Sequence, residues 1–318
     1  MIKKARALVL LSGGLDSILA VKLLLEQGIE VQAINFRTNF CGPSLARRAS
    51  KMLNVPLREV SIREEFLPIL KKPKHGYGSG MNPCIDCHTL MLKRAGEIMR
   101  AEGYDFIATG EVLGQRPMSQ HKASLNIVEK DADLVGYLLR PLSAKLLEPT
   151  VAEKEGLVDR DKLFNISGRS RKTQIALAAQ YGIKEFPTPA SGCALTQEGF
   201  TARLKELMTN KPDFTSEDVD LVAVGRHFFY SELVEGGGSI QIILGRNQEE
   251  NEFLKNQTRK DEVFIIPINF SGPEALIRGS HILEENIMQA KELIVEFASR
   301  AKDLKKEDLV FDIIKGGL

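Results

Sequence analysis

The chain has 318 residues, 43% of them apolar and 27% charged, a composition typical of one or two packed domains. The first apolar run ends in Ser-Gly-Gly before a charged helix, so we expect a buried strand there and not a signal peptide. No window approaches 18 apolar residues, which excludes a membrane-spanning helix, and four cysteines in a chain of this length do not make a disulfide scaffold. We therefore expect a cytoplasmic protein without membrane association.

The formal net charge of +1 hides an asymmetry along the chain. Residues 1–210 contain 30 Lys and Arg against 22 Asp and Glu, whereas residues 211–318 contain 13 against 20. A basic first part and an acidic second part predict a polyanionic partner for the first part alone.

The first part alternates predicted strands with predicted helices. Strands are expected at 5–11, 30–36, 57–62 and 105–109, and helices at 17–27, 44–53, 84–102 and 172–181. This alternation predicts an α/β fold, a doubly wound parallel sheet whose ligands bind at the carboxyl ends of the strands. Residues 71–83, rich in Gly, Pro and Lys, are expected to form a mobile basic loop. We assign this first domain to residues 1–210.

A change of composition at residues 210–214 indicates a linker to a second, smaller α+β domain, residues 211–318. Thr215 is a predicted helix N-cap with Asp218 as its capping-box partner. The alternating run SIQIILG is the expected second strand of a hairpin. Further elements are expected as helices at 249–256 and 282–302 and a strand at 263–268.

The stretch LVLLSGGLDS carries the strongest chemical signal. A buried strand ends directly in Gly13 and Gly14, which allow a sharp turn and bring backbone N–H groups close to an anion. The helix that follows adds its unpaired N–H groups and its positive dipole end. Ser12 and Ser17 have hydroxyls for phosphate oxygens, and Asp16 is a candidate Mg²⁺ ligand. No Gly-Lys-Ser/Thr follows, so the loop is not a Walker A motif.

The loop SGGLDS is similar to the PP-loop signature SGGxDS of the ATP pyrophosphatases. This resemblance implies cleavage of ATP to AMP and pyrophosphate, with a carbonyl oxygen activated as its adenylate. FIATGEVLGQRPMSQ resembles the TGESLGQxxSQ segment of tRNA 4-thiouridine synthetases, with one extra residue before Ser119, and LRPLSAKL resembles their RPL segment. NPCIDC and SGC (191–193) resemble segments of tRNA 2-thiouridine synthetases. The resemblance covers roughly residues 5–207 and implies that Thr109, Gly110 and Glu111 lie by the nucleotide.

Cys84 and Cys87 lie three residues apart at a predicted helix start, on one face, where the helix N-terminus is expected to lower thiol pKa values. With Cys193 they resemble the ligand set of [4Fe–4S]-dependent tRNA thiolases, in which one iron is left without a protein ligand. The 2-thiouridine enzymes have an acid/base aspartate at the position of Cys84, and we take Asp86 as its replacement.

Three other interpretations of the cysteines stay open. The first is a zinc site with His88 as fourth ligand. The second is a cluster-free mechanism with Cys87 and Cys193 as persulfide and resolving thiols. In the third the thiols are inert. Cys41 has no partner by spacing and is interpreted as a bystander at the edge of the nucleotide pocket.

Chemical modification of a uridine in folded tRNA requires the base to swing out of its stack while contacts to phosphates hold the RNA in place. The predicted RNA contacts are basic residues of two polar segments: Lys71, Lys72, Lys74, Arg169, Arg171 and Lys172. In the second domain, VGRHF and ILGRNQEENEFL resemble the NFACT-R domain, which would make Arg226 and Arg246 RNA contacts. Docking or homodimerisation is an equal alternative for this acidic part.

These features together predict an ATP–Mg²⁺-dependent tRNA sulfurtransferase that adenylates a uridine carbonyl and replaces its oxygen with sulfur. The cofactor expected is a [4Fe–4S] cluster, and the partners are tRNA and a sulfur donor, either sulfide or a cysteine desulfurase. One alternative keeps ATP activation but uses a small-molecule carbonyl or carboxylate, for sulfur insertion or amidation. The other is a non-catalytic nucleotide-binding RNA adaptor. The sequence does not specify which uridine, or which of its carbonyls, is modified.

Overall fold

The computed structural model describes residues 4–187, 193–231, 239–299, 301 and 304–316. The chain divides into two compact units, Met1–Gln197 and Glu198–Leu318. The helix Glu198–Asn210 (α8), which the sequence analysis placed in the first domain, thus belongs to the second unit. One contact that ties it there is the hydrogen bond that Arg203 Nε donates to Val222 O, at 2.8 Å.

The first unit is built on a five-stranded sheet with the order β3-β2-β1-β4-β5, in which every neighbouring pair is parallel. Its strands are β1 (Arg6–Leu10), β2 (Glu30–Arg37), β3 (Leu57–Ser61), β4 (Phe106–Ala108) and β5 (Leu138–Leu139). The predicted doubly wound parallel sheet is confirmed. Because the strand order reverses between β1 and β4, the carboxyl ends of these two strands border the crevice where such folds bind ligands.

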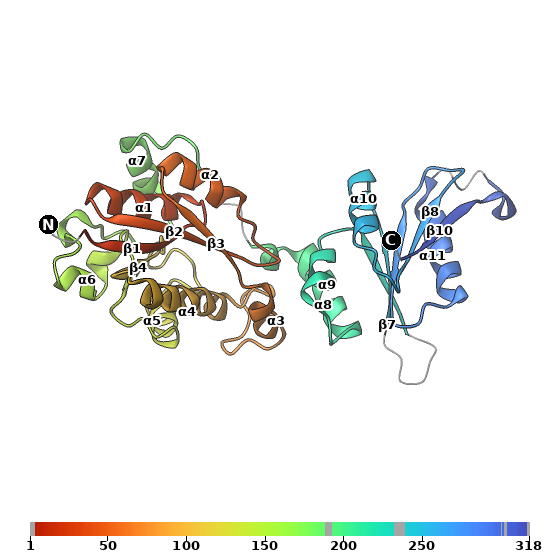
Figure 1. Ribbon diagram of the computed structural model, residues 1–318, viewed down its shortest axis with the longest axis horizontal. Coiled ribbons are helices and arrows are strands. Elements are labelled where there is room, and N and C mark those ends of the chain that lie inside the picture. Colours follow the sequence, from red (N-terminus) through yellow and green to blue (C-terminus); the bar gives the residue numbers. More distant parts are fainter. Residues whose placement is uncertain (1–3, 188–192, 232–238, 300, 302–303, 317–318) are drawn as a thin grey trace. The chain divides into compact units, whose positions relative to one another are not determined.

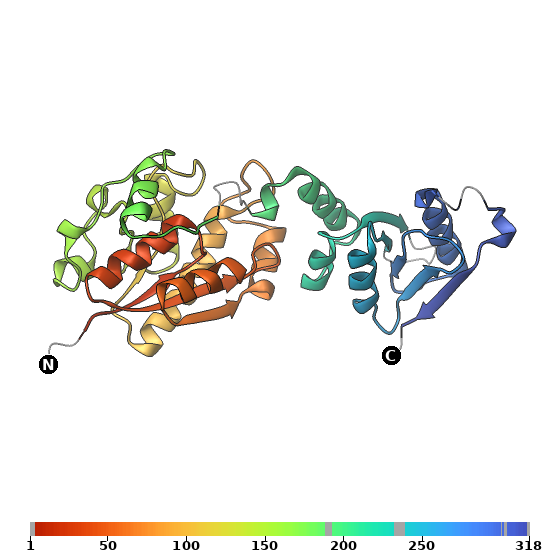
Figure 2. The same cartoon turned by 90° about the horizontal axis from the view of Figure 1, so that it is seen from above.

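Helices cover both faces of this sheet, with α1, α2 and α7 on one side and α4 and α5 on the other (Figures 1 and 2). Alternate residues of β1 contribute to two separate cores, with Ala7 and Val9 facing α1 and Leu8 facing α4. The helices are α1 (Leu15–Glu26), α2 (Ser44–Leu53), α3 (Arg63–Lys71), α4 (Cys84–Glu102), α5 (Lys122–Asp131), α6 (Val151–Lys154) and α7 (Lys172–Gln180).

The helices predicted at 44–53 and 84–102 are confirmed residue for residue as α2 and α4. The sequence analysis did not identify α3, which contains Pro68 in its interior, where proline ordinarily disfavours a helix. The segment after α3, expected to be a mobile loop, is fastened at several points. The Tyr77 hydroxyl, for example, donates to Leu70 O at 2.7 Å.

The second unit contains a five-stranded antiparallel sheet with the order β10-β8-β9-β7-β6. Its strands are β6 (Arg226–Ser231), β7 (Ser239–Leu244), β8 (Val263–Pro267), β9 (Ala275–Arg278) and β10 (Phe311–Lys315). Its helices are α8, α9 (Ser216–Leu221), α10 (Gln248–Asn256) and α11 (Glu284–Phe297). The predicted α+β class, the hairpin of β6 and β7 and the capping box of Thr215 and Asp218 are confirmed, although α11 is shorter than expected.

None of the helices among the described residues is long and apolar enough to cross a lipid bilayer.

Candidate active site

The loop between β1 and α1 has the geometry that an anion site requires. Gly13 has a φ of +82°, and a Cβ on it would lie 2.3 Å from the carbonyl carbon of Leu45, so the turn admits only glycine. Gly14 caps α1 without a side-chain hydrogen bond, which leaves N–H groups of the first turn for an anion. Ser17 Oγ donates to Gly14 O at 2.8 Å and lies 3.1 Å from Ser12 Oγ.

The segment after β4 lies directly on the first turn of α1. A Cβ on Gly110 would be 2.4 Å from the backbone nitrogen of Ser17 and 2.5 Å from the carbonyl carbon of Asp16. The structure therefore brings Thr109, Gly110 and Glu111 to the phosphate loop, where the sequence analysis put them.

Asp16 is surrounded by polar side chains from distant parts of the chain. Its Oδ2 accepts a hydrogen bond from Gln115 Nε2 at 2.7 Å and lies 3.8 Å from an Arg171 guanidinium nitrogen. Gln174 is completely buried and donates from Nε2 to Gln115 Oε1 at 3.1 Å. Buried atoms without a partner remain on three of these residues: Asp16 Oδ1, Arg171 Nε and Gln174 Oε1. Buried polar atoms are ordinarily paired, so this group has the chemistry of an open site for a charged ligand.

Arg171 is thus placed against the phosphate loop and not among the exposed basic side chains with which it was grouped. The sequence analysis also missed Gln115 and Gln174. Gln115 lies in the GQ pair of a segment already singled out for its resemblance, which was an available signal. Gln174 lies on the buried face of α7 and gave no sequence signal.

Glu111 is the centre of a buried ionic network behind this site. Its Oε1 lies 2.8 Å from His88 Nδ1, and its Oε2 accepts from Thr109 Oγ1 and from Arg140 Nε, each at 3.0 Å. Burial raises the pKa of Glu111, but the charge of Arg140 and the hydrogen bond from His88 outweigh it and lower the pKa to about 2. Arg140 Nη1 also bonds Glu129, at 3.0 Å. The network links the segment after β4 to α4 and engages His88, the fourth ligand of the alternative zinc site.

All four cysteines are free thiols and lie in one neighbourhood. Cys84 and Cys87 occupy the first turn of α4, and Asn82 Nδ2 donates to Cys84 Sγ at 3.2 Å. The backbone after Cys193 lies beside the segment that precedes α4, since Met81 N donates to Leu195 O at 3.0 Å. The neighbouring Ser191 and Gly192, also singled out in the sequence, lie outside the described residues.

Cys41 belongs to this neighbourhood too, which its spacing along the sequence did not predict. The Cys193 thiol donates a hydrogen bond to the Cys41 sulfur, which lowers the pKa of Cys41 to about 7 and raises that of Cys193. Burial raises the pKa of Cys87, and negative charge on Cys41 and Cys84 raises it further. The expectation that the helix N-terminus lowers thiol pKa values is therefore wrong for Cys87.

Asp86 is buried, and both of its carboxylate oxygens are used by one residue. Oδ2 accepts from the backbone nitrogen of His75 and Oδ1 lies 3.0 Å from His75 Nδ1. The carboxylate therefore holds the 72–83 segment against α4. The acid/base role predicted for Asp86 would require this contact to open.

The remaining basic residues of the predicted RNA contact lie mainly at the surface. Lys74 forms an ion pair with Asp131 at 2.5 Å, while four others have exposed side chains: Lys71, Lys72, Arg169 and Lys172. In the second unit, Arg246 is ion-paired with Glu250, and the Arg226 guanidinium lies 4.8 Å from the centre of the Phe297 ring.

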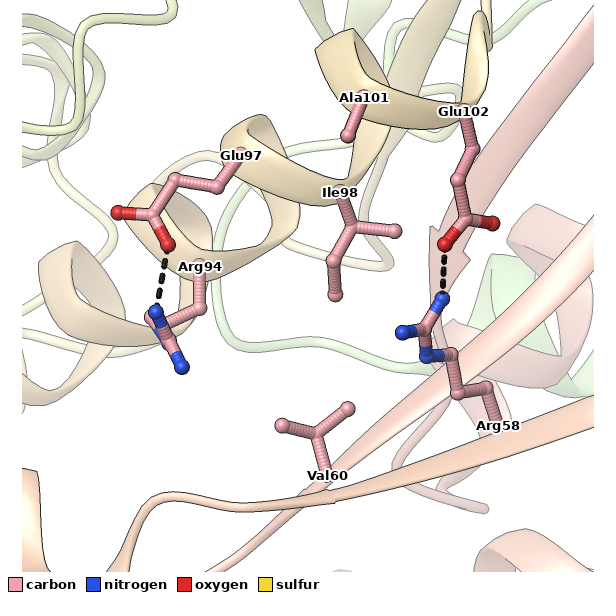
Figure 3. A pocket seen from close by; sticks show the side chains of 7 residues that line it. All are labelled: Arg58, Val60, Arg94, Glu97, Ile98, Ala101 and Glu102. Carbon is pink, nitrogen blue, oxygen red and sulfur yellow. Dashed lines mark hydrogen bonds and ion pairs between the residues drawn. The ribbon is translucent and has the colours of Figure 1, made fainter.

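A pocket of about 290 Å³ lies elsewhere, between the edge strand β3 and α4 (Figure 3). Figure 3 shows ion pairs on two sides of it, Arg58 with Glu102 and Arg94 with Glu97. None of the predicted site residues lines it, so it adds nothing to the chemistry described above.

Two family models match parts of the two units. The family "Thiamine biosynthesis protein (ThiI)" matches residues 3–146, and the family "NFACT protein RNA binding domain" matches residues 225–312. The first unit carries the PP-loop and resembles the tRNA thiouridine synthetases. The match to the ThiI family begins just before β1 and contains the phosphate loop, Cys41, the Cys84–Cys87 pair and the Glu111 network.

Several individual relatives of this PP-loop protein are tRNA-specific 2-thiouridylases. That of Syntrophus aciditrophicus is 29% identical over 231 residues, 64% of this chain and 56% of the relative. That of Caldicellulosiruptor saccharolyticus is 31% identical over 171 residues, 46% and 43% of the two chains. That of Leptospira biflexa is 26% identical over 322 residues, 91% and 77%. The chain spans about half the length of the first of these curated relatives.

Proposed function

We propose that this PP-loop protein is an ATP-dependent tRNA sulfurtransferase of the cytoplasm. The observation that carries the proposal is the convergence of four thiols with a phosphate loop at the carboxyl ends of β1, β2 and β4. Two chains of contacts connect the thiols with the loop. One runs from the turn of Cys41 through Leu45 to Gly13, and the other from Cys87 and His88 through Glu111 to Gly110.

The phosphate loop supplies the first half of the reaction. Ser12, Gly13, Gly14 and Ser17 would hold the pyrophosphate part of ATP through backbone N–H groups and hydroxyls. The buried Asp16 Oδ1 has no partner and fits a Mg²⁺ ligand, and Mg²⁺ supplies charge neutralisation when pyrophosphate leaves. Arg171 would donate to a phosphate oxygen from its buried, unpartnered Nε. These groups favour attack of a uridine carbonyl oxygen on the α-phosphate, which gives the adenylate and releases pyrophosphate.

Binding of the tRNA is supported by the matched families and by exposed basic side chains. The relatives are named tRNA-specific 2-thiouridylases, and the second unit matches an RNA-binding domain family. Lys72, Arg169 and Lys172 are exposed and would contact RNA phosphates, while the target base enters the site swung out of its stack.

For sulfur delivery, Cys84, Cys87 and Cys193 would be the ligands of the [4Fe–4S] cluster that the sequence predicts, since thiolates are the ligands that such a cluster requires. Among the described residues, no three Cys, His, Asp or Glu side chains are grouped to hold a metal ion, so the zinc site and the cluster both rest on the sequence alone. When bound, the cluster would supply an iron able to carry sulfide.

A second sulfur route, without a cluster, would use Cys87 and Cys193 as the persulfide and resolving thiols. Both are free thiols, which suits transfer from a persulfide followed by closure of a disulfide. Anaerobic purification separates the routes. The cluster route predicts bound iron and sulfide, lost in Cys84→Ser and retained in Cys41→Ser. The persulfide route predicts a protein without iron that thiolates tRNA at full rate.

The function itself is tested by incubating the protein with ATP, Mg²⁺, a sulfur donor and unmodified tRNA. We expect AMP, pyrophosphate and thiouridine, read by nucleoside mass spectrometry, with AMP formation dependent on tRNA. Pyrophosphate release with a small-molecule acceptor but not with tRNA would instead favour the small-molecule enzyme. If no AMP forms under any condition, the result would favour the alternative of a non-catalytic nucleotide-binding RNA adaptor.

A further inference from the structure

Two glutamine side chains form a series of hydrogen bonds that ends on Asp16, and we call this series the glutamine relay. Gln174 donates from Nε2 to Gln115 Oε1 at 3.1 Å, and Gln115 donates from Nε2 to Asp16 Oδ2 at 2.7 Å. Consecutive hydrogen bonds polarise one another, so an amide that accepts at its oxygen donates more strongly from its nitrogen. Asp16 Oδ2 therefore receives a strengthened hydrogen bond that begins on α7.

The relay leaves the two carboxylate oxygens of Asp16 in different surroundings. Oδ2 is bonded to Gln115 and lies 3.8 Å from an Arg171 guanidinium nitrogen. Oδ1 is buried and has no hydrogen-bond partner among the described residues. Because Gln115 holds Oδ2, the carboxylate cannot turn freely, and Oδ1 is the atom that it presents to a ligand.

Both glutamines lie on backbone that is anchored to the same part of the fold. Gly168 N donates to Leu113 O at 2.7 Å, which joins the segment of Gln115 to the segment that leads into α7. Gln174 lies in the first turn of α7 and is completely buried. The donors of the relay are therefore held in place by the fold before any ligand binds, which is the property of a residue that positions another one.

Packing alone does not explain a glutamine at position 174. The buried face of α7 otherwise consists of the apolar Leu177 and Ala178, and Gln174 Oε1 has no partner among the described residues. An apolar side chain of similar size would fill the same space without burying an unpaired amide oxygen. The hydrogen bond that Nε2 donates to Gln115 is thus the property of Gln174 that its position uses.

We propose that Gln115 and Gln174 are positioning residues for the Mg²⁺ ion that Asp16 would bind together with ATP. Carboxylates that bind metals in proteins are themselves hydrogen-bonded, and their partners fix the orientation of the ligand oxygen. Both glutamines act through Asp16, by holding Oδ1 toward the metal. The inference rests on the proposed ATP-dependent function and deepens it, since it names the residues that orient the metal ligand.

The choice of metal ion gives a readout of this role. Mg²⁺ requires near-ideal octahedral geometry, whereas the larger Ca²⁺ accepts more oxygen ligands in a flexible arrangement. A carboxylate that has lost its orientation should therefore bind Mg²⁺ less well while it still serves Ca²⁺. A change in the shape of the phosphate loop would instead weaken nucleotide binding with either metal and without metal.

The test is the affinity of the full chain for α,β-methylene-ATP, which cannot be cleaved between its α- and β-phosphates, measured by isothermal titration calorimetry. Each variant is titrated in Mg²⁺, in Ca²⁺ and in EDTA. In Mg²⁺, Gln115→Ala should weaken binding by about tenfold or more, because the hydrogen bond to the carboxylate is lost. The loss should be smaller in Ca²⁺ and absent in EDTA.

The order of the relay is tested by combining variants. Gln174→Ala alone should weaken binding in Mg²⁺ by about threefold, the effect of losing a hydrogen bond between neutral groups. Because Gln174 acts through Gln115, the double variant should bind no more weakly than Gln115→Ala. Gln180→Ala is the matched control for Gln174→Ala, since Gln180 is an exposed glutamine on the same helix, and it should change none of the affinities.

Three results overturn the inference. These are an equal loss of affinity in Mg²⁺, Ca²⁺ and EDTA, an unchanged affinity of Gln115→Ala in Mg²⁺, and losses that multiply in the double variant. Melting temperatures close to wild type show that the variants are folded, and Gln115→Asn, whose amide has a shorter reach, replaces Gln115→Ala if that variant unfolds. If the wild-type protein binds the nucleotide under no condition, the proposed function fails and this inference with it. That result differs from a metal-dependent wild type with an unaffected Gln115→Ala.

Discussion

Arg171 and Lys172 are consecutive basic residues with different surroundings, which gives a matched pair of substitutions. Arg171 lies by Asp16 with a buried, unpartnered Nε, whereas Lys172 is exposed. Because a hydrogen bond to a charged group contributes about 1.5–3 kcal/mol, Arg171→Ala should lower kcat/KM for ATP by about tenfold or more. Affinity for tRNA should change little. Lys172→Ala should do the reverse, weakening tRNA binding and reducing its salt dependence. An equal loss of tRNA affinity in both variants would show instead that Arg171 contacts the RNA, as the sequence predicts.

Glu111 provides a prediction on stability because it is the buried partner of Arg140. Glu111→Gln removes one of the two carboxylates that pair with this guanidinium, the other being Glu129, and breaking a buried pair costs up to about 3–5 kcal/mol. Glu97→Gln is the control, since its pair with Arg94 is largely exposed and is worth at most about 1 kcal/mol. Urea unfolding at neutral pH measures both values. Similar losses of unfolding free energy in the two variants would show that the buried network stabilises the fold no more than an exposed ion pair does.

The same carboxylate makes stability depend on pH in the acid range. Its pKa in the folded protein is about 2, below the ordinary value for glutamate, so the folded state favours the ionised form. The stabilisation is fully present above the unfolded pKa and is lost as the pH falls from there through about 2. The free energy of unfolding of the wild type should therefore fall more steeply over this range than that of Glu111→Gln. Parallel curves would contradict the lowered pKa.

The nucleotide site depends on the turn between β1 and α1. This turn requires both a positive φ and the absence of a Cβ at Gly13, and a comparison with Gly28 distinguishes the two requirements. Gly13 and Gly28 have similar positive φ angles, +82° and +75°. A Cβ on Gly13 meets backbone at 2.3 Å, whereas a Cβ on Gly28 meets nothing within 4 Å. Gly28→Ala should cost only the left-handed strain, about 1–2 kcal/mol, with AMP formation retained. Gly13→Ala should lose AMP formation and more stability, as measured by urea unfolding and a pyrophosphate assay.

Elements with strong local signals were predictable from the sequence. The buried run of β1, the helix of α4 with Pro83 before it and Gly103 after it, and the β6–β7 hairpin each combine a clear period with a start or stop signal. The short strands β5 and β9 have neither a clear period nor a start or stop signal. Their two to four buried residues take their conformation from the neighbouring strand rather than from their own pattern.

The candidate site was predictable only where its residues are adjacent in sequence. The phosphate loop and the Cys84–Cys87 pair are local motifs whose spacing indicates their chemistry. Cys41, Gln115 and the Arg171–Gln174 pair lie on three separate segments, and no spacing along the chain relates one segment to another. Their roles depend on contacts such as that between Gln115 and Asp16, which only the tertiary structure specifies.

The division of the molecule into two units makes the position of α8 testable. Sequence composition places the boundary after residue 210, whereas the structure places α8 with the second unit. Leu204 and Leu207 of this helix are fully buried, and Arg203 donates to Val222 O on the far side of the linker predicted at 210–214. A fragment of residues 198–318 should therefore fold cooperatively. A fragment of residues 211–318 should be less stable by roughly 3 kcal/mol, the burial free energy of two leucine side chains.

Urea unfolding of the two fragments, followed by circular dichroism, measures this difference, and limited digestion of the full chain with a protease that cleaves after Glu and Asp gives an independent check. Cleavage after the exposed Glu185, before α8, should predominate over cleavage after the exposed Asp213, between α8 and α9, because domain boundaries are the exposed segments with the fewest contacts. Equal stability of the two fragments, together with predominant cleavage after Asp213, would return α8 to the first domain. The RNA-binding family match, which begins at residue 225, lies within both fragments, so a tRNA affinity that survives in 198–318 but not in 211–318 would reflect folding and not a lost contact surface.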